Sequence, residues 1–411
     1  MSTWSAKFDV NLSSSQAWFN DWRMAAKNVF EQVGLPHSKQ DNWKYAPLKQ
    51  VFAQDFQEKN TGHFKPSNFP LDSHVVLCKN QKTFLDALGN LPKGVVVMPL
   101  VDAVEEHPEL VKKYLGQIAK NRHGFIALNS GLFQAGVFIY LPKNVKLEKP
   151  ILIHHQSEHG IISHVRNLVV CEADSSLHLI EYFDSADDHQ GLINQVTEVF
   201  LQQFSNCQHL KIQNLSTAAM LQSDIYVLQQ QESSFESFIL QLGAHYASCD
   251  AHVEFQGEHS QASLNGVFKA SEQQIHQQRL NIEHAKPHCK SSQNFRGILD
   301  DHAHGVFIGQ VLVDKDAIKT EAHQSNKNLL LSKYAQMTTC PQLQIFADDV
   351  ICSHGATVGQ LDEDAIFYLQ TRGVQQEAAK DLLVHAFIQE PIDCITSENF
   401  KQCCMDYLSK K

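Results

Sequence analysis

The sequence of 411 residues lacks the patterns that mark several common classes of protein. It contains neither a GxxxxGK(S/T) phosphate loop nor a GxGxxG fingerprint, so it offers no visible nucleotide site of its own. Lys and Arg (34) are outnumbered by Asp and Glu (45), the formal charge is −11, and no basic cluster stands out. This charge balance disfavours a nucleic-acid partner and anchoring to an anionic membrane.

Long apolar runs and a recognisable leader are also missing. The most apolar run, residues 94–104 (GVVVMPLVDAV), is too short to span a bilayer and contains Pro and Asp. The first twenty residues lack a charged region followed by an apolar one, so no signal peptide is expected. We therefore expect a soluble cytoplasmic protein without a membrane partner.

The ten cysteines form no CxxC pair and no regular framework. In a chain of this size without a leader they should be reduced, since disulfides belong to oxidising compartments. Most are expected to be buried and to behave as small hydrophobic residues.

Three regions with different sequence patterns follow one another along the chain. Residues 1–122 are mixed and mostly helical, with one predicted helix over residues 14–36 and another over residues 105–120. Residues 123–361 contain many short alternations of apolar and polar residues at regular spacing, which indicates an all-β region. Residues 362–411 return to helical patterns. The alternation alone leaves a sandwich, a barrel and a β-solenoid open.

The C-terminal region begins with two predicted helices. The first, over residues 362–373, has acidic residues in its first turn and ends at Gly373. The second, over residues 375–391, carries an apolar face and is expected to stop at Pro391. That face includes Leu382, Leu383, Ala386 and Phe387, and it must pack on the β-region or on another protein.

Residues 348–357 (DDVICSHGAT) collect several side chains that can ligate a metal. In a strand, Asp348, Cys352 and His354 would share one face, with Cys352 and His354 about 6.6 Å apart along the backbone. Two ligands are too few for zinc, and a Cys–His dyad would lack an orienting third group. The segment is therefore half of a metal site, a poor dyad, or a buried Cys beside a hydrogen-bonding His at a turn.

Other histidines compete with this segment. They gather in three groups: His154, His155, His159 and His164; His284 and His288 with Cys289; and His302 with His304. A mononuclear metal site among them, or an enzyme acting on a polysaccharide or metabolite, are alternative functions. No HExxH motif and no paired-carboxylate motif supports either.

The region from Phe295 to about Val374 resembles the SufB/SufD family of the SUF iron–sulfur cluster assembly system. The motifs that carry the resemblance are AHGVFIGQVLVDKDAIKTEAHQSNKNLLLS and PQLQIFADDVICSHGATVGQLDEDAIFYLQTRG, and residues 42–48 (NWKYAPL) resemble a short N-terminal motif of the family. Ile351 stands where the family commonly has Lys, which suggests that the Ser353 face is buried. Cys352 and His354 would then face outward, toward a partner.

The resemblance implies a right-handed parallel β-helix core flanked by helical N-terminal and C-terminal regions. It implies a non-catalytic scaffold subunit that forms a heterodimer with SufB through the β-helix; paired β-helices also allow a homodimer when SufB is absent. The C-terminal helices would bind the ATPase SufC, which makes Leu382, Leu383, Ala386 and Phe387 docking candidates.

The resemblance also implies where a nascent cluster would be held. The site would lie at the interface with SufB, with a Cys of SufB and His354 as ligands and Cys352 as a weaker candidate. Imidazole is a plausible ligand to an iron–sulfur cluster. We expect no cofactor bound stably by the isolated chain and only a transient cluster in the complex.

Overall fold

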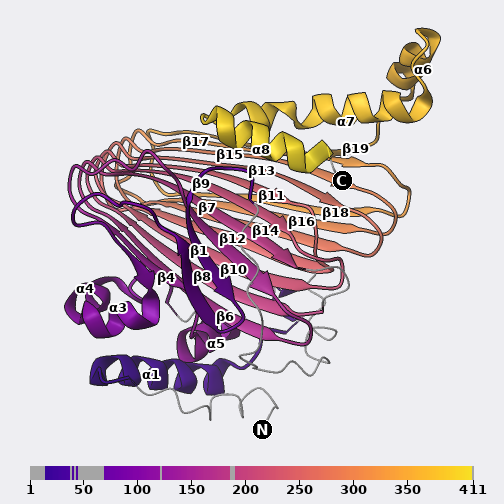
Figure 1. Ribbon diagram of the computed structural model, residues 1–411. Helices are drawn as coiled ribbons and strands as arrows, with labels where there is room; N and C mark the ends of the chain where they lie inside the picture. The colour runs from indigo at the N-terminus through magenta and orange to yellow at the C-terminus, as the bar shows by residue number, and fades with distance from the viewer. Residues whose placement is uncertain are drawn as a thin grey trace.

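Two β-sheets face each other in this protein, and the chain alternates between them (Figure 1). The computed structural model describes residues 14–37, 39–40, 43–44, 69–120, 123–185 and 190–409. None of the helices in these ranges is long and apolar enough to cross a membrane. Each strand from β4 onward pairs in parallel with the strand two places further on, so the chain winds as a β-solenoid of about seven turns. The predicted β-helix core between helical regions is confirmed, while the predicted boundaries after residues 122 and 361 stay predictions.

The ten-stranded sheet is called sheet 1 and the nine-stranded sheet is called sheet 2. In spatial order, sheet 1 contains β2 (Lys82–Ala87), β1 (His74–Lys79), β5 (Ile151–Ser157), β7 (Ser176–Ser185), β9 (Asn206–Asn214), β11 (Ser234–Gln241), β13 (Gln261–Ala270), β15 (Lys290–Leu299), β17 (Glu321–Leu330) and β19 (Ile351–Gly359). Sheet 2 contains β3 (Val96–Pro99), β4 (Val137–Leu141), β6 (Ile162–Cys171), β8 (Leu192–Leu201), β10 (Met220–Gln229), β12 (Tyr246–Phe255), β14 (Ile275–His284), β16 (His304–Val313) and β18 (Gln336–Ile345).

A repeated corner turn explains how the chain keeps its coil length. One residue with positive φ recurs at intervals of about thirty residues, at Asn144, Asp174, Phe204, Glu232, His259, His288 and Lys319. At most of these corners the backbone N–H of that residue donates to a carbonyl of the next coil, as from His288 to Ile318 O (3.0 Å). Left-handed backbone is costly for residues other than Gly, so a hydrogen bond between coils at each corner helps to offset that cost.

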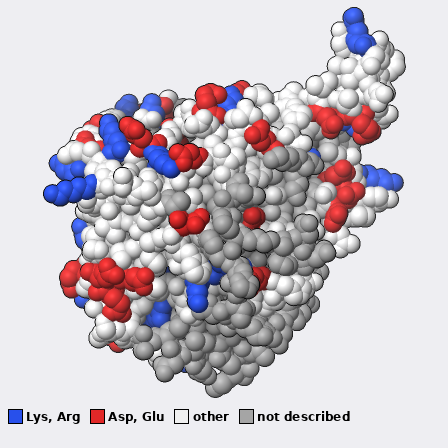
Figure 2. All heavy atoms as spheres, in the orientation of Figure 1, with Lys and Arg blue, Asp and Glu red and all other residues white. Residues whose placement is uncertain are grey.

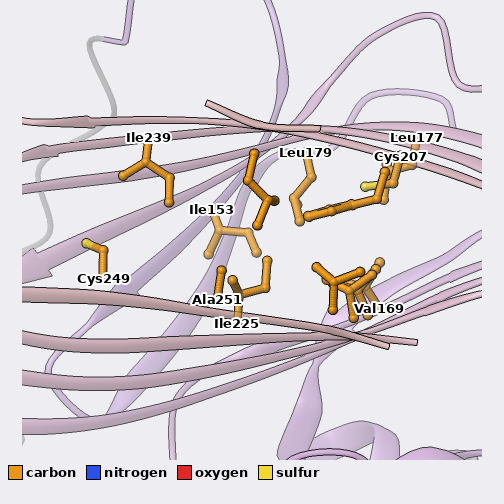
Figure 3. Packing of buried hydrophobic residues seen from close by; sticks show 14 of the residues in the cluster. Ile153, Val169, Leu177, Leu179, Cys207, Ile225, Ile239, Cys249 and Ala251 are labelled. Carbon is orange, nitrogen blue, oxygen red and sulfur yellow. The ribbon is translucent and has the colours of Figure 1, made fainter. Parts of the chain in front are cut away.

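The space between the sheets is filled by alternate residues of every strand. Figure 3 shows Ile153, Leu179 and Ile239 of sheet 1 opposite Ala251 and Ile225 of sheet 2, and all five belong to one buried apolar cluster. Cysteines belong to this core, and most of those in the chain are buried, as predicted. Burial contributes about 25 cal/mol per Å² of apolar surface, so this core is the main source of stability.

Four helices cover the outer face of sheet 2 near the start of the solenoid (Figure 1). They are α1 (Ala17–Val33), α3 (Leu100–Glu106), α4 (Pro108–Tyr114) and α5 (Gly124–Leu132). The helix predicted over residues 14–36 is confirmed in α1, which ends at Val33 and has Gly34 as its C-cap. The single helix predicted over residues 105–120 is wrong, because α3 ends at Glu106 and Pro108 starts α4. Figure 2 shows acidic side chains gathered over α3 and α4.

The predicted motif at residues 42–48 lies largely outside the described residues. Of its members, Trp43 is described and buried, and its ring lies 4.3 Å from the Arg279 guanidinium carbon. It also packs on Phe125 of α5, with ring centroids 5.5 Å apart. This contact ties the N-terminal layer to strand β14.

Three helices lie against the outer face of sheet 1 or project from it: α6 (Glu363–Thr371), α7 (Gln376–Asp393) and α8 (Glu398–Ser409). The two helices predicted for this region are present as α6 and α7. The predicted stop at Pro391 is wrong, because α7 continues to Asp393 and buries Pro391 against the solenoid. In Figure 1, α7 runs along the solenoid and α6 projects from its far end.

The two ends of the solenoid differ. At the end that we call closed, β2 and β3 run antiparallel to their neighbours, and Leu88, Leu91 and Val95 pack across the core. At the end that we call open, β19 and β18 are the last strands of their sheets. Many side chains of these last two strands are exposed. The segment singled out in the sequence lies at the open end.

Candidate functional site

Residues 348–357 begin in a bend and continue into the edge strand β19. The strand starts at Ile351, so the prediction that Asp348 shares one strand face with Cys352 does not apply. Asp349 is exposed and its carboxylate accepts a hydrogen bond from Lys319 Nζ at 2.6 Å. The Asp349 carboxylate is therefore engaged with Lys319, and Asp348 lies in the bend before the strand.

The inner face of β19 carries Cys352 and His354. Cys352 pairs in register with Ala322 and His354 with Gln324, and both of these partners on β17 are buried between the sheets. Ile351, in contrast, is 64% exposed on the outer face. The expectation that Ile351 would be buried and turn Cys352 and His354 outward is wrong. Both residues lie on the face of β19 that continues the inner face of sheet 1. His354 is nevertheless exposed, because β19 is the last strand of its sheet.

Cys352 is half-buried against a small apolar cluster. Its neighbours include Val311, Ala317, Ala322 and Ala347. Burial raises the pKa of the Cys352 thiol, although a backbone hydrogen bond from Ala322 lowers it in part. A thiol must lose its proton to ligate iron, so Cys352 is predisposed to remain neutral until a metal or a positive group is close.

The described residues do not complete a metal site around His354. Nowhere in the described ranges do three or more His, Cys, Asp and Glu side chains gather in a way that could hold a metal ion. Two ligands of one strand, of which one is exposed and one is half-buried, fit the interpretation of half a site.

Several of the competing histidines make polar contacts with other residues of the fold. His154 is buried and its Nε2 lies 2.7 Å from Asp184, and His284 lies 2.8 Å from Ser291 Oγ. His304 lies 3.1 Å from Thr338 Oγ1. Cys289 donates to the carbonyl of Gly257. Each of these side chains therefore has at least one polar contact inside the fold.

The remaining histidines of those groups are spread over separate coils. His302 stacks on Tyr334 and His288 stacks on His259, with ring centroids 4.8 Å and 4.7 Å apart respectively. His155 is fully buried inside the first coils, and burial lowers its pKa to about 3. A neutral ring stacked on Phe183 explains how it is tolerated there.

The docking candidates on α7 do not share one environment. Phe387 packs against the outer face of sheet 1, and Leu383 is half-buried. Leu382 and Ala386 are exposed to solvent. The apolar face predicted for this helix is thus divided between the solenoid and solvent.

A buried arginine holds the C-terminal half of α7 on the solenoid. Arg296 of β15 is almost fully buried and makes an ion pair with Glu390. Glu390 also accepts a hydrogen bond from Asn294 Nδ2 and makes an ion pair with Lys327. Partial burial raises the pKa of Glu390, but the hydrogen bond and charge of Arg296 outweigh it, so the pKa lies below its usual value.

Two features escaped the sequence analysis. On α6, Phe367 and Tyr368 are strongly exposed, and two adjacent aromatic residues, which cannot both face the same side of a helix, were the available signal. Inside the solenoid, Glu181 accepts hydrogen bonds from Lys211 and Gln195 at 2.9 and 2.6 Å. Burial raises the pKa of Glu181, but Lys211 and His209 lower it well below its usual range. The inner face of these strands carries polar as well as apolar residues, so the alternation in the sequence does not show that Glu181 is buried.

The geometry defines a β-solenoid that presents an incomplete set of metal ligands at an unpaired edge. A model of the SUF system FeS cluster assembly SufBD core domain matches residues 153–387, and a model of the SufBD protein N-terminal region matches residues 4–153. The chain therefore belongs to the SufBD family of the SUF iron–sulfur cluster assembly system.

Several curated relatives cover most of the chain. Iron-sulfur cluster assembly protein SufD of Escherichia coli is 28% identical over 90% of this chain and 88% of its own. SufD of Bacillus subtilis is 26% identical over 96% and 94%. A SufBD family protein of Synechocystis, slr0076, is 28% identical over 91% and 86%. Two of these three relatives are named SufD, and the third is named only as a member of the SufBD family.

Proposed function

We propose that this chain is a non-catalytic scaffold subunit that shapes a cluster site between two proteins. In this proposal a SufB-like subunit pairs with the open end, and a SufC-like ATPase binds the C-terminal helices. The nascent cluster is cargo that His354 and a cysteine of the SufB-like subunit hold together. Cys352 is a second, weaker ligand.

One observation carries the proposal. His354 is an exposed ligand at an unpaired strand edge, and the described residues around it supply only a half-buried thiol. Unpaired edges with apolar side chains are ready to pair with another chain. At this edge Ile351 and Val358 are exposed apolar residues, and a partner that covers them would also approach His354.

The tail supports the ATPase-binding part of the proposal. Phe367, Tyr368 and Leu382 are large apolar side chains that are more than half exposed on α6 and α7. Apolar helix faces of this kind are typical of docking to a groove on another protein. The sequence has no phosphate loop, which agrees with ATP hydrolysis belonging to a partner.

The test is reconstitution with SufB-like and SufC-like subunits, scored for a stable complex and for bound iron and sulfide. We expect His354→Ala to leave the complex intact and to reduce cluster formation strongly, with a smaller effect for Cys352→Ala. His288→Ala is the matched control, since His288 is exposed at a distant corner. Cluster formation at the wild-type rate by His354→Ala would exclude His354 from the site.

A further inference from the structure

A pair of buried amide side chains lies directly beneath His354. Gln324 of β17 is the register partner of His354, and strands in a sheet lie about 4.8 Å apart. Both side chains leave the same, inner face of sheet 1. We infer that Gln324 is a positioning residue for His354: when the His354 ring turns toward the interior, Gln324 Oε1 accepts its N–H and the other ring nitrogen faces the partner. This inference rests on the proposed function for the role of His354 as a ligand.

The amide of Gln324 is held in one orientation. Its Nε2 donates to Gln293 Oε1 at 2.6 Å, one strand further into the solenoid. This hydrogen bond directs the donor inward, which leaves Oε1 as the acceptor. Gln324 is only 4% exposed, and its Oε1 receives no hydrogen bond from any residue that the structure describes. A buried carbonyl oxygen without a donor is costly, so a donor from the next strand would be favourable.

A glycine on the opposite sheet makes room for this amide pair. A Cβ added to Gly309 of β16 would lie 1.9 Å from Gln324 Nε2 and 3.0 Å from Gln293 Oε1. Any other residue at position 309 would therefore displace the Gln324 amide. Strand β16, on the sheet opposite Gln324, thus leaves the space that the Gln324 amide occupies.

The chemistry of histidine ligands explains why such an acceptor matters. A neutral imidazole carries one proton, and the nitrogen without it is the one that can bind metal. Histidine ligands usually donate their other N–H to a carbonyl or carboxylate, which fixes both the tautomer and the ring orientation. Gln324 Oε1 is a carbonyl oxygen without a donor, carried by the register partner of His354 on the adjacent strand.

The first experiment uses the isolated chain and needs neither partner nor cluster. NMR of the protein labelled with ¹⁵N-histidine, at a pH where imidazole rings are neutral, measures which ring nitrogen of His354 carries the proton. The signal is assigned from its loss in His354→Ala. We expect one tautomer in the wild type, a mixture of both in Gln324→Leu, and one tautomer again in Gln324→Glu, which keeps an acceptor oxygen.

The matched control is Gln278→Leu. Gln278 of β14 is also an interior amide, and it donates to Gln241 rather than toward β19. This variant should leave the His354 tautomer as in the wild type, and circular dichroism checks that each variant is folded. Identical tautomer populations in wild type and Gln324→Leu would overturn the inference, whatever the fate of the scaffold proposal. If Gln324→Leu does not fold, a mixture of tautomers in Gln324→Glu would overturn it instead.

The second experiment joins the inference to the proposed function. In the reconstituted complex, Gln324→Leu should lower cluster formation by roughly 10–100-fold, the usual effect of removing a partner of a metal-binding histidine. Gln278→Leu should not. If His354→Ala abolishes cluster formation but Gln324→Leu matches the wild type, the scaffold proposal stands and the positioning role of Gln324 is wrong.

Discussion

The closed and open ends of the solenoid are built from the same repeating coil but are finished differently. At the closed end, two antiparallel strands and an apolar connection cover the core, and the first interior residues, such as Val76 and Ile151, are fully buried. At the open end, Val358 lies on the inner face of the last strand and is still 45% exposed. Stacked repeats are usually capped at both ends, because an uncovered coil exposes both apolar surface and strand edges. An end that no described residue covers is what the proposed pairing with another chain requires.

Truncation of inner-face side chains should separate the interior from the open end most strongly. Phe235→Ala, on β11 in the middle of the solenoid, removes a fully buried ring and should lower the free energy of unfolding by about 3–5 kcal/mol. Val358→Ala, at the open end, should cost less than about 1 kcal/mol, because much of its surface is already in water. Urea unfolding of both variants measures the difference. Equal losses would show that the last coil is as well packed as the interior.

Acid should destabilise the protein through histidines buried in the closed part. Burial lowers the pKa of His155 from 6.5 to about 3, so the folded state keeps this ring neutral while the unfolded chain takes up a proton below pH 6.5. Stability is therefore lost as the pH falls from 6.5 toward 3, by about 1.4 kcal/mol per pH unit for this residue. His155→Phe, which keeps a ring against Phe183, should reduce the slope by that amount.

The control for this pH dependence is Phe183→Leu, which perturbs the same contact without removing a titrating group. It should lower stability equally at pH 5, 6 and 7, as measured by urea unfolding. If His155→Phe and the wild type instead show parallel curves, His155 does not stay neutral in the folded state.

The smallest expected effect is on the affinity for a SufB-like partner when a charge is placed on an edge strand. Val358→Lys places an ammonium group at the mouth of the open end and should weaken binding of a SufB-like partner by at least about tenfold, or 1.4 kcal/mol. Phe84→Lys places the same charge on β2, the last strand of sheet 1 at the closed end, and should leave binding unchanged. Titration calorimetry compares the two. Equal weakening by both would mean that the open end is not the pairing surface.

The sequence predicted the β-region from its alternation, yet it could not fix the coil. Apolar and polar residues alternate along these strands in the same way as along the strands of a sandwich. The corner residues with positive φ have no single residue type in common, as Phe204 and Lys319 illustrate. A shared backbone conformation rather than a shared side chain defines the repeat. The resemblance to a known family, not the pattern, selected the solenoid.

The candidate site was predicted in its residues but not in its orientation. Ile351 is apolar, and the ordinary rule that apolar residues are buried placed its face inward. The rule failed because β19 is an edge strand on which Ile351 stays 64% exposed. Gln324 could not be found from the sequence, since its role depends on register with His354 across thirty residues of intervening chain.

The unbroken register of the coils fixes the distance between elements that are attached to different coils. Each coil advances the structure by about 4.8 Å, and strands cannot shift by a fraction of that step without breaking their ladder. Helix α7 is fastened to β15 by Arg296, and His354 lies on β19, two strands further along sheet 1. The separation between the tail and the open end can therefore change only in whole coils. A relative with one coil more or fewer between these strands would present its tail and its edge to partners at a different spacing.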